Sequence, residues 1–231
     1  MALEEYVLWK PLYYASIGIF ILALVLLPFN SVLSLIVIFS LVSLWSRIPG
    51  GILYIFYSLE LTDFFAFVIA ANIGGVAGGL FGAITLLFSK IFFPDEEFYV
   101  PLYHSFSIFI SALLVPLILT FTGGVNIVSF FIYEGIIFLI YFILVFLFSR
   151  EGLGYEISEL PFDIFFNFFV NGGLITALGT VLSNLMTKGI TSGWPLVIFT
   201  GVILFFFVLT KSGKRLSKLT FFKRFKHKAE E

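Results

Sequence analysis

Cysteine is absent from the 231 residues, and charged residues make up only 12% of them. The lack of cysteine excludes disulfides, thiol nucleophiles and metal sites with cysteine ligands. The scarcity of charge excludes an ordinary soluble domain, in which about a quarter of the residues are charged. We also expect no nucleic-acid partner.

The sequence also lacks the local motifs of common enzymes. It contains no His-Glu-x-x-His pattern, no Gly-x-Ser-x-Gly pattern and no Walker phosphate-binding loop. Proteolytic and phospholipid-transferring chemistry therefore has no support, and we expect no cofactor and no catalytic residue. A lipid-modifying enzyme built without such a motif is kept as a third alternative.

Apolar residues dominate instead, at 60% of the chain, and the mean hydropathy is +1.12. Uncharged runs of about 15 to 30 residues recur, and a helix needs about 20 residues to cross a bilayer. The sequence thus predicts an all-α integral membrane protein, with the lipid bilayer as its surroundings. The segment Met1–Lys10 is acidic and no small-residue cleavage site follows it, so we expect no removable signal peptide.

Basic residues are concentrated near the C-terminus. Eight of the thirteen lie between Lys211 and Lys228. Cytoplasmic segments of membrane proteins carry an excess of lysine and arginine, so this tail predicts a cytoplasmic C-terminus. The expected location is therefore the cell membrane, crossed several times by the chain.

Two long apolar stretches contain paired glycines. Glu60–Lys90 has a Gly-Gly pair shortly after Asn72, and Glu159–Lys188 has one directly after Asn171. A glycine inside a helix costs about 1 kcal/mol relative to alanine, so these glycines need a reason. One reason is close packing of neighbouring helices, and the other is an unwound point that faces a cavity.

These glycine-broken stretches close two copies of a longer pattern. Pro101-Leu102-Tyr103 repeats Pro11-Leu12-Tyr13, and Ser149-Arg150 repeats Ser46-Arg47. Matches in the same order predict an internal repeat. The predicted parts are a first membrane repeat (residues 1–100), a second membrane repeat (101–190), a terminal helix (191–210) and a basic cytoplasmic tail (211–231).

Counting each glycine-broken stretch as one span gives seven transmembrane helices. Three spans per repeat is an odd number, so this count predicts a 3+3 inverted repeat plus a terminal helix. The alternative is eight spans, in which Gly51–Ala71 forms a helix of its own. It places Lys10, Arg47, Lys90 and Arg150 on the cytoplasmic side. It also buries Glu60 and Asp63 near the bilayer centre. A central aspartate costs about 2.5–3.5 kcal/mol, and Glu60 would add to that cost.

An acidic residue inside an apolar segment is the first candidate for a site. Glu134 lies close to the middle of Val125–Phe148. An ionisable residue at that depth is a functional hypothesis by default. The structural alternative is a protonated carboxyl group that is hydrogen-bonded to Asn167 or His104.

A polar stripe is the second candidate. Asp163, Asn167 and Asn171 recur every fourth residue and therefore share one face of a helix. Asp63 and Asn72 are their counterparts in the first glycine-broken stretch. Interhelical hydrogen bonding, worth roughly 0.6 kcal/mol per contact, is the structural explanation of the same stripe.

Part of the chain resembles a known family. Leu61–Phe88, with its GGVAGGLFGAITLL core, is similar to the region of the second and third helices in substrate-binding S components of energy-coupling-factor vitamin transporters. Phe166–Leu185 resembles their last helix. The resemblance implies a membrane-embedded substrate-binding subunit with six helices and both termini inside. It also implies an Ala-x-x-x-Ala seam for docking a transport partner, which the first two spans here lack.

These patterns together predict a membrane transporter, or a membrane-embedded substrate-binding subunit, for a small solute or ion. The expected site lies between the two glycine-broken helices. Its asparagines would hydrogen-bond the solute or coordinate a cation, and Glu134 would be the titratable member. The alternative is a non-transporting scaffold, whose glycine seams and tail hold partner membrane subunits.

Overall fold

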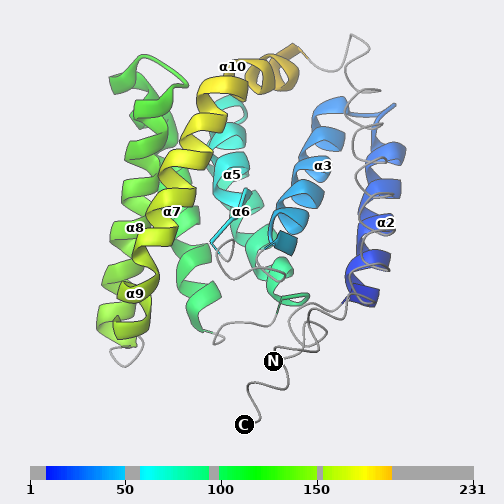
Figure 1. The fold of residues 1–231 in the computed structure, drawn as a ribbon. Helices are drawn as coiled ribbons and strands as arrows, with labels where there is room; N and C mark the ends of the chain where they lie inside the picture. The colour runs from blue at the N-terminus through cyan, green and yellow to red at the C-terminus, as the bar shows by residue number, and fades with distance from the viewer. Residues whose placement is uncertain (1–8, 50–57, 94–98, 150–152, 189–231) are drawn as a thin grey trace.

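The computed structural model describes residues 9–49, 58–93, 99–149 and 153–188. Every regular element in these ranges is helical, and Figure 1 shows the helices side by side as a bundle. In chain order they are α2 (Trp9–Leu26), α3 (Ser31–Ser46), α5 (Thr62–Asn72), α6 (Gly75–Lys90), α7 (Tyr99–Thr122), α8 (Ile127–Phe148), α9 (Leu153–Asp163), the π-helix η3 (Ile164–Val170) and α10 (Asn171–Lys188). The all-α prediction is confirmed for the described residues. The predicted terminal helix and basic tail lie outside them.

Three stretches are long and apolar enough, by length and composition, to cross a membrane: Tyr99–Thr122, Ile127–Phe148 and Leu160–Thr187. The apolar parts of the other helices, α2, α3, α5 and α6, are only 10–17 residues long. With 11 residues, α5 is about 16 Å long, roughly half the thickness of a hydrocarbon core. Membrane-length helices are thus concentrated in the second half of the described chain.

The helices α2 and α3 form an antiparallel hairpin. Asn30 caps α3, because its side chain accepts a hydrogen bond from a backbone N–H in the first turn. The Ser34 hydroxyl donates to the carbonyl of Ala23, and the Trp45 indole donates to the Ser16 hydroxyl. Early residues of α3 therefore face late residues of α2.

The first glycine-broken stretch is a pair of helices that fold back on each other. Gly74 has a φ of 137°, a backbone conformation that favours glycine, and it reverses the chain between α5 and α6. A Cβ atom at Gly78 would lie 2.5 Å from the Cβ of Ala70, and one at Gly82 would lie 3.0 Å from the Cβ of Ala66. Later residues of α6 therefore face earlier residues of α5. The predicted single pass through this stretch is wrong, because the glycine makes a turn.

The other glycines of α6 let α7 approach closely from a second side. A Cβ at Gly75 would lie 2.6 Å from the carbonyl oxygen of Ala112, and one at Gly79 would lie 3.0 Å from that of Phe109. Both contacts are to backbone atoms, so a larger side chain would force the helices apart. Of the two explanations offered for these glycines, close packing is the one that the geometry bears out.

The second glycine-broken stretch is not broken. The helices α9, η3 and α10 follow one another without a gap, and Gly172 and Gly173 lie in the first turn of α10. A Cβ at Gly172 would meet the Phe131 ring at 2.6 Å, whereas one at Gly173 would meet nothing within 4 Å. The predicted break here is wrong. The irregularity lies just before the glycines, in the seven residues of η3.

The predicted inversion between the two repeats is also wrong, because α5 and α10 run parallel. The Asn171 amide donates to the carbonyl of Glu60, and the Asn72 amide donates to the hydroxyl of Ser183. Both pairs are 111 residues apart, so the two helices advance in the same direction. The fold-back at Gly74 causes this parallel arrangement. Because of it the first half has four described helices, α2, α3, α5 and α6, so the second half starts in the same direction as the first.

After Gly74 the chain therefore runs in the direction that the eight-span alternative predicts. Its proposed helix over Gly51–Ala71 is nonetheless not continuous, because Leu59–Leu61 are not helical. Superposition of the two halves stays a prediction.

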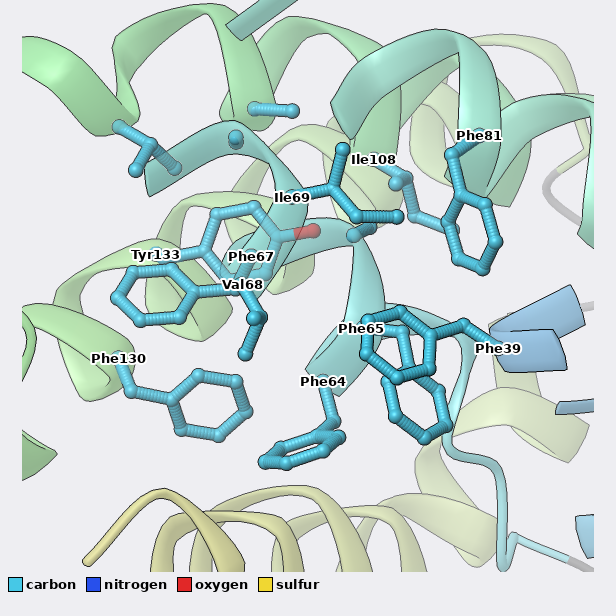
Figure 2. Packing of buried hydrophobic residues seen from close by; sticks show 14 of the residues in the cluster. Phe39, Phe64, Phe65, Phe67, Val68, Ile69, Phe81, Ile108, Phe130 and Tyr133 are labelled. Atoms are coloured by element: carbon cyan, nitrogen blue, oxygen red, sulfur yellow. The ribbon is translucent and has the colours of Figure 1, made fainter. Parts of the chain in front are cut away.

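The core surrounds α5, in which every residue from Thr62 to Ala70 is buried. Phe67 packs against the rings of Phe130 and Tyr133 on α8, as Figure 2 shows. On another side, Phe65 stacks on Phe39 of α3 with ring centroids 4.4 Å apart. A short helix enclosed on several sides holds the polar residues at its N-terminal end inside the bundle.

Single cysteines can test the fold-back at Gly74, since the chain has no cysteine of its own. We expect a membrane-impermeant maleimide to label Phe29→Cys and Ile91→Cys from opposite sides of sealed vesicles. Phe29 follows α2 and Ile91 follows α6, and both are exposed. A single pass from Glu60 to Lys90 would instead place both on the same side, so labelling from one side would contradict the hairpin.

Candidate functional site

Buried ionisable side chains gather at the N-terminal end of α5. Glu60 precedes the helix, Asp63 lies in its first turn, and Glu134 lies on α8. All three are buried, although carboxylates are almost never fully buried unless they are paired. Together with Arg47 and His104 they form what we call the buried ionisable cluster.

Arg47, at the C-terminal end of α3, forms an ion pair with Glu60. The other carboxylate oxygen of Glu60 accepts a hydrogen bond from the Thr62 hydroxyl at 2.6 Å. Glu60 lies in the connection before α5, outside the helices. Burial alone would raise the pKa of Glu60, but the charges of Arg47 and His104 and the hydrogen bonds from Arg47 and Thr62 lower it to about 2. Glu60 is therefore a carboxylate whose charge is matched by a cation.

Asp63 faces His104 of α7, with 3.3 Å between Oδ2 and Nε2. The Asp63 side chain is 2% exposed and that of His104 is 25% exposed, so the pair joins a buried acid to a partly exposed base. The second carboxylate oxygen of Asp63, Oδ1, is buried and has no hydrogen-bond partner in the described ranges. Asp63 is thus only half satisfied.

Glu134 is completely buried, and within the part of the chain that the structure describes neither of its carboxylate oxygens has a hydrogen-bond partner. The predicted hydrogen bond to Asn167 or His104 is therefore wrong. The hydroxyl of the adjacent Tyr133 is buried without a partner as well, and Figure 2 shows its ring within the aromatic core. About nine in ten buried polar groups have a partner, so Glu134 needs an explanation.

Asn167 and Asn171 border the same region from η3 and α10. Asn171 is fully buried, and its amide donates to the carbonyl of Glu60 at 3.0 Å. The same amide lies 3.5 Å from Oδ1 of Asn167. Oδ1 of Asn171 has no partner. The two asparagines therefore tie the π-helical segment to the start of α5.

The other two predicted site residues lie elsewhere. Asn72 ends α5, about 16 Å along the helix from its start. Its amide donates to the carbonyl of Val68 and to the hydroxyl of Ser183. Asp163 is partly exposed and lies at the junction of α9 and η3. The structure brings Asp63, Glu134, Asn167 and Asn171 towards one region and places Asn72 at the far end of α5.

Three members of the cluster were not among the predicted site residues: Arg47, Glu60 and His104. Glu60 carried a usable signal, since an acid lies at the edge of a long apolar stretch. His104 carried none, because 41 residues separate it from Asp63 and no local pattern joins them.

Within the described ranges, no group of three or more histidine, cysteine, aspartate or glutamate residues is arranged to hold a metal ion. The cluster instead offers acceptor oxygens without donors, on Asp63, Glu134 and Asn171. Such an arrangement can accept protons or hydrogen-bond donors.

Comparisons of this chain with protein-family models, with curated proteins and with solved structures find no match. Any function therefore has to be argued from the cluster itself.

Proposed function

We propose that the chain is a membrane transporter, or the membrane-embedded substrate-binding subunit of one, for a small solute or ion. The observation that carries the proposal is a surplus of buried acid. Three carboxylates lie in the cluster, the Arg47 charge is paired with Glu60, and His104 is the base beside Asp63. Among the described residues, Glu134 is left with neither a cation nor a hydrogen-bond donor. Inside membrane proteins, such ionisable residues mark the paths of substrates, ions and protons.

The chemistry of the cluster favours a cationic ligand. The acceptor oxygens of Asp63, Glu134 and Asn171 lack donors, so an ammonium group or a bare cation would complement them. An anion would meet like charge, which is costly in an apolar interior. We therefore expect a small amine or a monovalent cation to bind better than any carboxylate or phosphate.

The distribution of charge supports a multi-pass arrangement in the cell membrane. The turns that join α2 to α3, α5 to α6 and α7 to α8 contain no charged residue. Arg47 and Lys90 follow or end helices at the opposite end of the bundle. By the positive-inside rule we assign that end to the cytoplasm, with Lys188 at the end of α10 as an exception. The basic tail supports a cytoplasmic C-terminus.

One observation that favoured the scaffold alternative no longer does so. The glycine seams were expected to hold partner subunits, but those of α6 are occupied by α5 and α7 of the same chain. The S-component resemblance stays compatible with the proposal as a binding subunit that works with a separate transport partner.

Flux through liposomes tests the proposal. We expect the purified protein to bind or carry sodium, potassium or methylammonium, and Glu134→Gln to lower binding and flux at least tenfold, because it removes the unmatched acid. Binding is measured on detergent-solubilised protein with radiolabelled ligand, and uptake is measured in vesicles. Binding without uptake would indicate the substrate-binding subunit.

Glu4→Gln makes the same chemical change near the N-terminus and serves as the control, with no expected effect. If wild type and Glu134→Gln bind and carry these probes equally, or neither does so, the scaffold is favoured.

A further inference from the structure

We propose that Glu134 is a proton-binding site that is filled from His104 through Asp63. Coupling of transport to protons rests on the proposed function, whereas the proton site itself does not. The three residues come from three helices: His104 from α7, Asp63 from α5 and Glu134 from α8. Their side chains are increasingly buried in that order. The side-chain exposure falls from 25% at His104 to 2% at Asp63, and Glu134 is 0% exposed.

The entry step is set by the His104–Asp63 contact. The Nε2 atom of His104 and the Oδ2 atom of Asp63 are 3.3 Å apart, close to the upper end of hydrogen-bond distances. A protonated His104 can pass its Nε2 proton to Oδ2, which leaves a neutral imidazole and a neutral carboxylic acid. His104 then takes a new proton from outside, since its side chain is partly exposed.

The second step uses the free oxygen of Asp63. The proton that Asp63 takes from His104 is on Oδ2. Because Oδ1 has no hydrogen-bond partner among the described residues, the neutral carboxyl group can turn about its Cβ–Cγ bond and carry that same proton away from His104. Glu134 receives that proton, becomes a neutral acid, and Asp63 returns to the carboxylate. One proton moves inward in the two steps, and no net charge is created.

Glu134 is the end of the path because, while no cation is bound, its surroundings tolerate the neutral form better than the ion. An ionised carboxylate without a partner in an apolar interior costs several kcal/mol. Asp63 and Glu60 add negative charge across the same interior. Ionisable and polar groups surround Glu134 and its donors. From the segments packed around them these are Glu60 just before α5, Asp63 in its first turn, Arg47 at the end of α3, His104 on α7, Tyr133 and Tyr141 on α8, Asn167 on η3 and Asn171 on α10.

Infrared spectroscopy of the full chain in detergent tests the proton site without any transported solute. At neutral pH and in buffer without sodium, potassium or methylammonium, we expect the carbonyl stretch of a buried neutral carboxylic acid in the wild type. The band should disappear in Glu134→Gln and persist in the control Glu4→Gln. After transfer to heavy water, the deuterium shift of this band should be at least tenfold slower in His104→Gln and in Asp63→Asn than in the wild type.

Each outcome decides one part of the inference. Absence of the band in the wild type, or its persistence in Glu134→Gln, would overturn Glu134 as the proton site. An unchanged deuterium shift in both His104→Gln and Asp63→Asn would overturn the path. If Glu134→Gln fails to fold, the band and the exchange rates of the other two variants still decide the question. Failure of the flux assay with the band intact would count against transport alone.

Discussion

Replacement of Arg47 by methionine is expected to lower the free energy of unfolding by about 3–5 kcal/mol, because Glu60 would stay buried without its cation. Methionine keeps an unbranched apolar side chain, so the loss of the charge dominates. The measurement is reversible unfolding in detergent with increasing denaturant, followed by circular dichroism. A change below about 1 kcal/mol would contradict the buried ion pair, since surface pairs contribute no more than that.

The matched control removes both charges. The double variant Arg47→Met with Glu60→Gln should be more stable than Arg47→Met alone, since it leaves no unpaired carboxylate. The pH provides a second check. The pKa of Glu60 is lowered from 4.5 to about 2, so its stabilisation is complete above about pH 4.5 and is lost as the pH falls towards 2. The difference in stability between wild type and Arg47→Met should therefore narrow over that interval.

Gly78→Ala is expected to destabilise the protein by about 1–3 kcal/mol, because the contact between α5 and α6 leaves no room for a methyl group. The new Cβ would lie 2.5 Å from the carbonyl oxygen of Ala66 and 2.6 Å from the backbone nitrogen of Ala70. Backbone atoms cannot turn away as a flexible side chain can, so the two helices would have to separate. Unfolding in detergent measures the effect.

Gly173→Ala is the control for that variant. A Cβ at this position meets nothing within 4 Å, and the residue lies in the first turn of α10. Alanine should therefore be neutral or stabilising by up to about 1 kcal/mol, as its higher helix propensity suggests. Equal effects of the two substitutions would show that α5 and α6 do not pack closely at Gly78.

The sequence predicted helices well because long apolar runs in a bilayer must satisfy their backbone hydrogen bonds internally, as helices do. It could not decide what each glycine pair does. Asn72 and Asn171 both precede glycine pairs, yet the chain turns at Gly74 and continues as a helix through Gly172. The difference lies in the residues that follow. Gly75, Gly78, Gly79 and Gly82 let α6 lie against α5 and α7, whereas the second stretch has fewer glycines to support such a return.

Sequence alone could predict a site residue only where an ionisable residue lies deep inside an apolar segment. Glu134 is such a residue, and it is fully buried. The pairing of Asp63 with His104 depends on how α5 and α7 meet, and that meeting depends on the turn at Gly74. Once the chain direction after Gly74 was predicted wrongly, no rule of local spacing could bring these two side chains together.

The uncharged turns at one end of the bundle have a consequence for proteolysis. Trypsin cuts after lysine or arginine, and the turns at residues 27–30, 73–74 and 123–126 contain neither. Between residues 9 and 149 the lysine and arginine residues are Lys10, Arg47 and Lys90, all at the opposite end of the bundle. Lys10 precedes Pro11, a bond that trypsin does not cut, so Arg47 and Lys90 are the cleavable residues. In the proposed multi-pass arrangement, trypsin therefore reaches this part of the chain from one face of a sealed vesicle only, and the orientation of the protein in the vesicle decides whether it is cut.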